Sequence, residues 1–433
     1  MDPITIAILG IVAMFVLIVL RVPIGIAMAV VGVAGYGILS GFAPALTILG
    51  TEASSAMANV DLAVIPLFLL MGNFATSAGL SSDIYNLAYA FVGHRRGGLA
   101  LSTIGGCGFF GAICGSSTAT AATFGRIALP EMLSRGYSRR LATGCIAAGG
   151  TLGSLVPPSV IIVIYAVAAE EFIIELFKAA VIPAILQIIL YFVAIMVTVR
   201  LDPSAGPAGP RMSWLERFRI LIKSWGAVLI LVGVIGGIYG GVFTVTEAAA
   251  FGASATFIFA LGRRRLTKEA FWEALTGTAV TTAFIYVIII GANVFTYFIA
   301  LSRMPDTMVT AISGLHASKF VILAILLLLY LILGSIFDSV SAMLITLPFV
   351  LPLITQLGYS PVWWGIINVV VIEIGMITPP IGLNVFVLQG VAPDIPLKSI
   401  FRGIMPFFYV DVFRLVALTV FPWLTLWLPS VLR

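Results

Sequence analysis

Hydroxyl-bearing residues are concentrated in one stretch of an apolar region, residues 113–123, which read ICGSSTATAAT. A polar side chain without a hydrogen-bond partner is costly in hydrocarbon, so these hydroxyls need a role. If a helix breaks here, free carbonyls and hydroxyls suit a small hard cation such as Na⁺, and the N-terminus of the next helix suits an anion. If the helix is continuous, the same residues form a packing surface or bond back to their own helix. The surrounding elements must decide between these two interpretations.

The composition is that of a protein that crosses a membrane many times. Of 433 residues, 61% are hydrophobic and only 9% are charged, whereas a soluble domain carries roughly 25% charged residues. The net charge of +5 comes from basic residues in short loops and does not indicate nucleic-acid binding. The start MDPITIAILG lacks a basic segment and predicts no cleavable signal peptide. We therefore expect an all-α polytopic membrane protein in a lipid bilayer.

Apolar runs long enough to span a bilayer are separated by polar or interrupted segments. Two apolar regions, 101–135 and 318–357, are interrupted by Gly, Ser, Asp or Pro. Four segments are more amphipathic than the spans, and we expect them to lie along the membrane interface or against other helices: 44–58, 81–93, 213–224 and 267–277. The predicted spans are 4–20, 22–40, 62–80, 141–169, 173–199, 226–243, 246–262, 278–300, 361–390 and 404–429.

The charges predict the orientation. With the N-terminus outside, most basic residues fall inside the cell, as the positive-inside rule requires. This holds only if 101–135 and 318–357 each enter and leave the membrane on one side, so both are predicted to be re-entrant helical hairpins. The predicted inside residues are Arg21, Arg95, Arg96, Arg135, Arg139, Arg140, Arg200, Arg211, Arg217, Arg219, Lys223, Arg263, Arg264, Arg265, Lys268, Lys398 and Arg402, and the outside ones are Lys178, Arg303, Lys319 and Arg433.

The two halves of the chain are related by an internal repeat. A GYS triplet begins at Gly136 and again at Gly358, and 21 residues later each is followed by a Pro-Pro pair, at Pro157 and Pro379. We divide the chain into a first repeat (1–201, hairpin 101–135, broken helix 141–169), a linker with an interfacial helix (202–225), and a second repeat (226–433, hairpin 318–357, broken helix 361–390). An odd number of spans per half inverts the second repeat, which is typical of secondary transporters.

The Pro-Pro pairs predict helix breaks that expose backbone oxygens at membrane depth. Such irregular backbone is tolerated only where it is buried or lines a cavity. One Ser/Thr-rich patch is usually a packing interface, but four patches paired by a repeat favour a binding site. Of the acids, Asp338 lies at the second hairpin tip and Glu373 on the second broken helix, and each has a functional and a structural interpretation. Asp411 and Arg414, three residues apart, are predicted to form an ion pair.

Four motifs together resemble one family. The stretches GSSTATAAT, GGTLGSLVPPS, GGVFTVTEAAAFGA and TPPIGLNVFV are similar to the large membrane subunit of tripartite ATP-independent periplasmic (TRAP) transporters, and the likeness covers essentially the whole chain. The SSTATA stretch is also similar to the hairpin signature of divalent-anion/Na⁺ symporters. The resemblance implies an inverted-repeat, elevator-type fold with about ten or eleven transmembrane helices, two re-entrant hairpins and two broken helices.

The resemblance also implies a function. The protein would import an organic anion, such as a C4-dicarboxylate or another carboxylate, across the bacterial inner membrane, with Na⁺ as coupling ion and no organic cofactor. A periplasmic solute-binding protein would deliver the substrate, and a small four-helix membrane subunit, expected as a separate chain, would complete the complex. The N-terminus would be periplasmic.

The family's site residues carry over to two hairpin tips and two helix breaks. Ser335-Ile336-Phe337 stands where the first tip has Ser-Ser-Thr, and neither tip carries an Arg, so carboxylate binding would depend on N–H groups and hydroxyls. The implied Na⁺ ligands are Ser116, Ser117, Thr118, Gly149, Thr151 and Gly153 at the first site, and Gly334, Ser335, Asp338, Thr378 and Gly382 at the second. The implied substrate residues are Thr118, Ser159, Ser339 and Asn384.

Two other classes of function are compatible with a polytopic membrane protein. A stand-alone Na⁺/dicarboxylate symporter would share the fold but need no binding protein. An intramembrane enzyme would need a nucleophile with a base, a catalytic pair of Asp, or an HExxH metal motif. The sequence has no HExxH or GxSxG motif and no intramembrane His, so we expect that the protein is not an enzyme.

Overall fold

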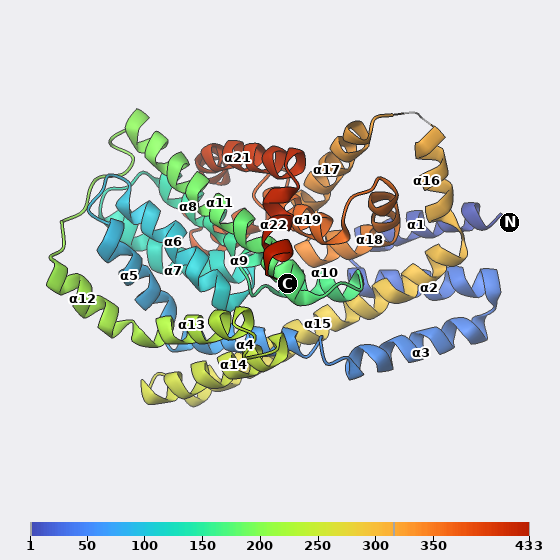
Figure 1. The fold of residues 1–433 in the computed structure, drawn as a ribbon, viewed down its shortest axis with the longest axis horizontal. Coiled ribbons are helices and arrows are strands. Elements are labelled where there is room, and N and C mark those ends of the chain that lie inside the picture. The colour runs from blue at the N-terminus through green and yellow to red at the C-terminus, as the bar shows by residue number, and fades with distance from the viewer. Residues whose placement is uncertain (1, 315–316, 433) are drawn as a thin grey trace.

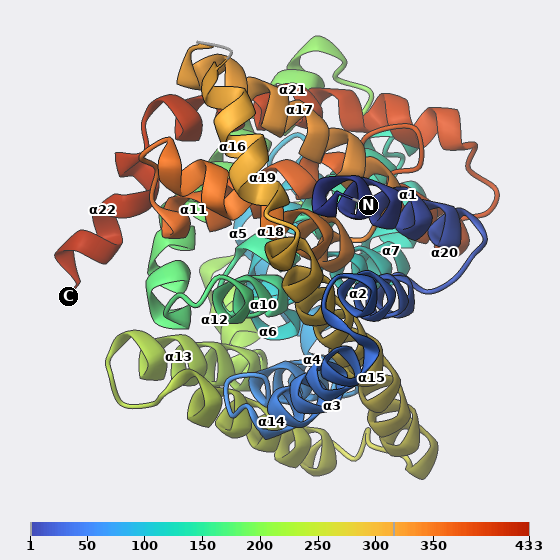
Figure 2. The ribbon, with the colours of Figure 1, turned by 90° about the vertical axis from the view of Figure 1, so that its right-hand side faces the viewer.

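The computed structural model describes residues 2–314 and 317–432, and this part of the chain is helical throughout, without a strand (Figures 1 and 2). Arg433, assigned above to the outside, lies beyond the described residues. The first half of the chain contains α1 (Pro3–Val19), α2 (Ile24–Ser40), α3 (Phe42–Ala58), α4 (Val64–Ser77), α5 (Leu80–Val92), α6 (Gly98–Cys114), α7 (Ser117–Ser134), α8 (Arg139–Gly150), α9 (Leu152–Leu155), α10 (Val160–Ala168) and α11 (Ile173–Leu201).

The second half contains α12 (Trp214–Lys223), α13 (Trp225–Tyr239), α14 (Val245–Gly262), α15 (Lys268–Leu301), α16 (Met304–Gly314), α17 (Lys319–Ile336), α18 (Ser339–Gln356), α19 (Pro361–Gly375), α20 (Leu383–Val391), α21 (Leu397–Val420) and α22 (Trp423–Val431). Local chemistry sets several of these boundaries. Ser213 with Glu216 forms a capping box at the start of α12, and Thr244 with Glu247 does the same for α14.

Fewer helices are long enough to span a bilayer than the ten or eleven predicted. Six are long and apolar enough in the described residues (α11, α14, α15, α17, α18 and α21), and bent pairs raise the number to nine at most. Helices α1 and α2 have 17 residues each, about 26 Å, slightly less than a hydrocarbon core of about 30 Å. Helix α6, also of 17 residues, ends at a hairpin tip, and α19, of 15 residues, ends at a helix break.

Three boundaries differ from the sequence-based expectation. The segments 267–277 and 278–300 form one continuous 34-residue helix, α15, because no residue between them breaks the backbone hydrogen bonding. The predicted last span, 404–429, is divided at Pro422 into α21 and α22. Helix α16 was not predicted, because its 11 residues carry a weaker apolar pattern than the spans.

One group of helices, which we call the α15 layer, consists of α2, α3, α4, α13, α14 and α15. Its helices run side by side along the lower part of Figure 2, apart from α2, which lies above them against α15. Small residues let α2 and α15 approach closely: a Cβ on Gly25 would lie 2.6 Å from the Val287 carbonyl oxygen, and one on Gly32 would lie 2.8 Å from the Phe295 nitrogen. This is the close packing that glycine permits between helices in membranes.

The second group, which we call the hairpin body, consists of α6–α10 and α17–α20, with α11 and α21 packed against it. It contains the helices that carry the polar motifs of the sequence. Trp363 and Trp364 of α19 are completely buried in it, and Tyr330 of α17 packs edge-on against Trp364. The two groups meet mainly where α4 contacts α6 and where α15 contacts α18.

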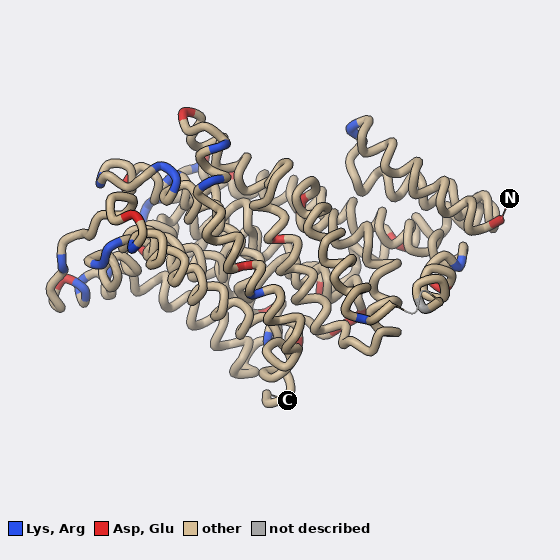
Figure 3. The backbone as a smooth tube through the Cα atoms, turned by 90° about the horizontal axis from the view of Figure 1, so that it is seen from above, with Lys and Arg blue, Asp and Glu red and all other residues tan. Residues whose placement is uncertain are grey.

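Most Lys and Arg residues gather at one end of the molecule (Figure 3). This distribution is the one used above to predict which end faces the cytoplasm. The orientation can be tested with single cysteines, because Cys107, Cys114 and Cys145 are all buried and free.

We predict that Asp306→Cys is labelled by a membrane-impermeant maleimide in intact spheroplasts, whereas Ser204→Cys is labelled only after permeabilisation. Both positions are exposed. Asp306 follows Arg303 on the predicted outer side of the membrane, and Ser204 belongs to the 202–213 linker on the predicted inner side. The unsubstituted protein, with its three buried cysteines, gives the background. Labelling of Ser204→Cys in intact spheroplasts would contradict the orientation.

Candidate functional site

The first hairpin consists of α6 and α7, which pack against each other and are joined at a tip of two residues. Gly115 adopts the left-handed conformation (φ +64°), which glycine reaches without strain, and Ser116 is extended. The Ser116 hydroxyl accepts a hydrogen bond from the Ala119 amide at 3.4 Å, and the Thr120 hydroxyl donates to the Ser116 carbonyl at 2.8 Å. The tip therefore caps the N-terminus of α7.

The second hairpin consists of α17 and α18, with Phe337 and Asp338 at its tip. One oxygen of the Asp338 carboxylate accepts hydrogen bonds from the amides of Val340 and Ser341, both at 3.1 Å. A carboxylate in this position satisfies two unpaired amides and complements the positive end of the helix dipole. The Asp338 side chain thus serves α18 itself.

Each half also contains a helix interrupted by its Pro-Pro pair. In the first half, α8 and α9 end before Val156, and α10 continues at an angle of 42° after the residues Pro157, Pro158 and Ser159. In the second half, α19 ends at Gly375 and α20 begins at Leu383. The interrupted backbone in between carries the GSLVPPS and MITPPIG segments of the repeat.

Each hairpin tip is hydrogen-bonded to the helix break of its own half. The Ser117 amide donates to the Ser154 hydroxyl at 3.2 Å, and the Val160 amide donates to the Gly115 carbonyl at 3.3 Å. In the second half the Gly382 amide donates to the Ser335 carbonyl at 3.1 Å. Within each half, the hairpin tip and the helix break therefore satisfy some of each other's hydrogen-bonding groups, as backbone inside a membrane requires.

Two side-chain contacts then join the polar residues across the helices. The Asn384 amide nitrogen donates to the Ser117 hydroxyl at 2.7 Å, which links the second helix break to the first hairpin tip. The Ser339 hydroxyl donates to the Glu373 carboxylate at 2.9 Å, which links the second tip to α19. All four side chains are at least nine-tenths buried. We call these four residues, with Ser154, the polar junction.

The residues predicted for the first ion site surround the first tip and the first helix break. Ser116, Ser117, Thr118 and Gly153 lie together there, and Ser116 and Thr118 are 3.3 Å apart through their hydroxyls. Gly149 faces α6, since a Cβ on it would lie 2.9 Å from the Cys107 sulfur. The backbone of Thr151 belongs to the break, but its hydroxyl points toward α11.

The residues predicted for the second ion site surround the second tip and helix break. Gly334 packs against α19, where a Cβ would lie 2.6 Å from the Ile372 carbonyl oxygen. The Ser335 hydroxyl donates to the Ile332 carbonyl of its own helix at 2.7 Å, and the Thr378 hydroxyl donates to the Ile374 carbonyl at the end of α19 at 2.6 Å. The Gly382 amide donates to the Ser335 carbonyl of the tip. Of the predicted substrate residues, Ser339 and Asn384 belong to the polar junction. Thr118 lies at the first tip, and the Ser159 hydroxyl donates to the Ser154 carbonyl.

The sequence did not single out Ser154 or assign Glu373 a partner. The sequence signal that could have identified Glu373 as a site residue is its position on the helix that leads to a Pro-Pro break. The corresponding signal for Ser154 is its position as the first serine of GSLVPPS. The contact of Ser117 with Asn384 spans 267 residues, and no sequence spacing predicts it.

A buried polar network supports the first helix break from behind. Asp411 and Arg414 of α21 form the predicted ion pair, 2.9 Å apart and about 1% exposed. Tyr191 donates to Asp411 at 2.5 Å, and Gln187 donates to Tyr191 at 2.9 Å and to the Thr151 hydroxyl at 2.7 Å. The network therefore fixes Thr151 to α11 and α21.

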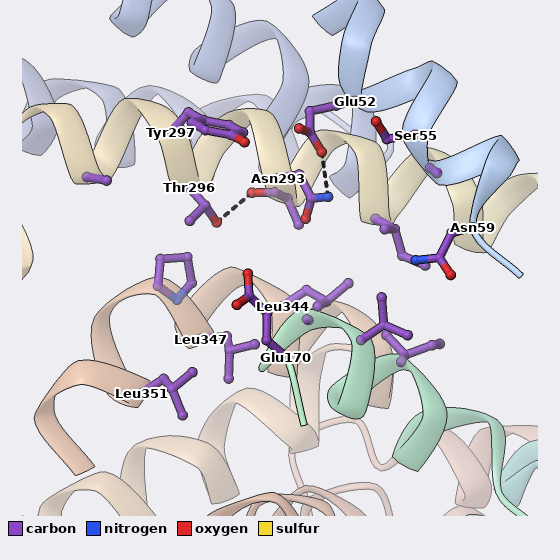
Figure 4. A pocket seen from close by; sticks show the side chains of 18 of the residues that line it. Glu52, Ser55, Asn59, Glu170, Asn293, Thr296, Tyr297, Leu344, Leu347 and Leu351 are labelled. Atoms are coloured by element: carbon purple, nitrogen blue, oxygen red, sulfur yellow. Dashed lines mark hydrogen bonds between the residues drawn. The ribbon is translucent and has the colours of Figure 1, made fainter. Parts of the chain in front are cut away.

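A cavity of about 820 Å³ lies elsewhere, between the α15 layer and the hairpin body (Figure 4). Glu52 and Asn293 lie on one wall, 2.8 Å apart, and Glu170 lies on the other. The acidic residues Glu52, Glu170 and Asp306 line it, and its described lining contains no Lys or Arg. This charge disfavours an organic anion, so the polar junction remains the better candidate for a substrate site.

The comparison with known protein families decides the identity. The model of the family described as "Tripartite ATP-independent periplasmic transporter, DctM component" matches residues 11–424. The chain belongs to this family. It is 35% identical over 370 residues to the C4-dicarboxylate TRAP transporter large permease protein DctM of Pseudomonas aeruginosa, covering 85% of this chain and 86% of the relative. It is 33% identical to the sialic acid TRAP transporter large permease protein SiaM of Vibrio cholerae, covering 86% and 87%.

This TRAP large permease also shares its fold with solved transporters of low sequence identity. MtrF of Neisseria gonorrhoeae superimposes with a TM-score of 0.59 at 12% identity, covering 97% of this chain and 95% of that one. At such low identity the likeness concerns the fold alone. The expected resemblance to the large TRAP subunit and the expected all-α transporter fold are thus confirmed.

We predict that Gly153→Ala lowers the thermal stability of the TRAP permease. A Cβ at residue 153 would lie 2.5 Å from the Ser116 carbonyl oxygen and the Thr120 hydroxyl, and overpacking of this kind costs about 1–3 kcal/mol. The measurement is the unfolding temperature of the purified protein. Gly236→Ala, where nothing but Val232 lies within 4 Å, is the matched control. Equal unfolding temperatures for the two variants would contradict the close packing of tip and break.

We predict that Asp411→Asn is strongly destabilising, because it leaves the Arg414 guanidinium buried without its counter-charge. Breaking such a pair costs about 3–5 kcal/mol, whereas replacing both partners by apolar residues is often close to neutral. The double variant Asp411→Leu with Arg414→Met should therefore unfold at a higher temperature than the single variant. A single variant as stable as the original protein would show that the pair is not buried.

Proposed function

We propose that this TRAP permease imports an organic acid anion across the bacterial inner membrane, coupled to the Na⁺ gradient, by an elevator movement. The observation that carries the proposal is the polar junction. Two hairpin tips and two helix breaks from different halves of the chain meet through Ser117, Asn384, Ser339 and Glu373 at buried positions. Secondary transporters built from repeats bind substrate and ions at such broken helices.

The chemistry of the junction supports both an anion and a cation. Helix α7 starts at the first tip with an uncharged cap, so its N-terminus directs a positive dipole end toward the site, which favours a carboxylate. The N-terminus of α18 is already capped by the Asp338 carboxylate. Hydroxyls and backbone carbonyls of the tips and breaks are hard oxygen ligands that favour Na⁺. In the described chain, no three His, Cys, Asp or Glu residues cluster as they would around a transition metal.

The substrate class is proposed from this chemistry together with the relatives. The two relatives above are named for C4-dicarboxylates and sialic acid, which are both carboxylates. Neither tip carries an Arg, so the bidentate ion pair that binds carboxylates most strongly is missing. Weak binding at the junction suits a system in which a periplasmic binding protein supplies the affinity and delivers the substrate.

The elevator movement is proposed from the division into two groups of helices. The hairpin body holds the whole polar junction, and the α15 layer contacts it over limited areas, with a cavity between them. The hairpin body would carry the substrate while the α15 layer stays fixed. Large apolar side chains remain exposed on the α15 layer, for example Leu229 and Val232 on α13 and Val280 on α15. Such surfaces suit lipid and the small four-helix membrane subunit, which we propose as a partner.

We predict that liposomes containing the permease and its small membrane subunit take up a C4-dicarboxylate or another organic acid only with an inward Na⁺ gradient and the periplasmic binding protein. Uptake that needs Na⁺ but not the binding protein would replace this proposal by the stand-alone symporter. Uptake independent of Na⁺, by a complex shown to be intact, would exclude the ion coupling.

In the same assay, Ser117→Ala should reduce uptake about tenfold, since it removes a hydroxyl that bonds Asn384 and belongs to the predicted ion site. Asp338→Asn is a sharper test than Asp338→Ala, because Asn keeps the helix cap while it removes the charge. Ser204→Ala, at an exposed linker position, is the control. Normal Na⁺-driven uptake by both test variants would contradict the assigned ion sites.

A further inference from the structure

Glu373 differs from the other acidic residues of the polar junction region in having a buried oxygen without a partner. Its side chain is on α19 and only 1% exposed. One carboxylate oxygen, Oε1, accepts the hydrogen bond from Ser339, and the other, Oε2, has no hydrogen-bond partner among the described residues. Asp338, by contrast, uses its carboxylate to cap α18.

The groups around Glu373 come from both halves of the chain. The hydroxyls of Ser117 and Ser154, from the first tip and the first helix break, face its carboxylate. Asn384 donates to Ser117, so the amide lies in the same cluster. The side-chain carbonyl oxygen of Asn384, Oδ1, is also buried and has no hydrogen-bond partner among the described residues. Side chains of both hairpin tips and of the first helix break thus meet at the Glu373 carboxylate.

An unpaired buried carboxylate needs a compensating positive charge or a proton. The nearby Arg414 is committed to Asp411, and no ion pair between a Lys or Arg and Glu373 occurs in the described residues. The polar groups gathered here are the Glu373 carboxylate and the hydroxyls of Ser117, Ser154 and Ser339, and the Asn384 side-chain amide adjoins them through its bond to Ser117. When Glu373 is ionised, these carboxylate, hydroxyl and amide oxygens carry one negative charge, and such a set of oxygens binds hard cations.

We propose that Glu373 and Asn384, with the hydroxyls of Ser117, Ser154 and Ser339, form a Na⁺ site that joins the two hairpin tips and is additional to the two sites predicted within each half. This inference rests on the proposed Na⁺ coupling. It assigns the cation a place between the two repeats, where a single ion holds both tips in the arrangement that binds substrate.

The site also gives an order of binding. A carboxylate substrate near Ser117, Ser339 and Asn384 would lie next to the negative charge of Glu373, which repels it in a low-dielectric interior. A cation bound to Glu373 removes that repulsion. Na⁺ therefore binds before the anion, and the ion gradient drives anion binding through this one charge.

The test measures Na⁺ binding directly, apart from transport. The permease is purified with its small membrane subunit, and its unfolding temperature is measured against NaCl at constant ionic strength, with choline chloride as the replacement salt. The original protein should be stabilised by Na⁺ in a saturable manner. Glu373→Gln keeps the shape of the side chain but removes its charge, and it should raise the Na⁺ midpoint by about tenfold or more and lower the apparent cooperativity. Glu273→Gln, at an exposed position on α15, should leave both unchanged.

The outcomes separate this inference from the proposed function. If Na⁺ does not stabilise the original protein more than choline, the Na⁺ coupling fails and the site fails with it. If Na⁺ stabilises the original protein and Glu373→Gln responds with the same midpoint and cooperativity, the carboxyl group is a neutral structural acid and only the additional site is overturned. Should Glu373→Gln not fold, Glu373→Asp, which shortens the ligand and keeps the charge, must shift the Na⁺ midpoint. An unchanged midpoint in that variant overturns the site as well.

Discussion

The rest of the structure depends on how the interrupted helices satisfy their backbone groups. A helix that ends in the middle of an apolar chain leaves amides and carbonyls that neither lipid nor apolar side chains can bond. Here the first tip bonds the first break through Ser117 with Ser154, and the second tip bonds the second break through Gly382 with Ser335. A hairpin without its broken helix would leave these groups unpaired, so each half must fold as a unit. The contact of Asn384 with Ser117 then joins the two units.

The two groups of helices are held together by different kinds of contact. Glycines such as Gly25 and Gly32 place α2 and α15 backbone against backbone, which makes a stiff apolar layer. The hairpin body instead depends on hydrogen bonds among breaks, tips and buried side chains, with the network of Asp411, Tyr191 and Gln187 behind it. The cavity beside α18 lies where these two kinds of packing meet. In the proposed elevator movement, the hairpin body would keep the hydrogen bonds of the polar junction within itself while it changes its position against the α15 layer.

The sequence predicts where helices break better than it predicts how the resulting segments pack against one another. Gly, Ser and Pro mark tips and broken helices locally, so the repeated motifs could be proposed from their spacing, and both hairpins from these interruptions together with the positions of Lys and Arg. The continuity of α15 was missed because an amphipathic segment followed by an apolar one looks like two elements, although no residue there stops a helix. The direction of the Thr151 hydroxyl, toward Gln187 and Tyr191, depends on the packing of α11. The cavity is lined from α3, α10, α15, α16 and α18, and no local pattern relates these segments.

The two halves share a backbone plan, but their charges differ. The first tip offers only hydroxyls, Ser116, Ser117 and Thr118, whereas the acidic side chains Asp338 and Glu373 both belong to the second half. The contacts across the molecule compensate for this difference, because Asn384 of the second half reaches Ser117 and the serines of the first half face Glu373. The hydroxyls of the first tip and the Glu373 carboxylate therefore meet in one buried cluster that neither half forms alone. In the proposed site the first half supplies hydroxyls and the second half supplies the carboxylate, so the binding of substrate and ion would involve both halves at once.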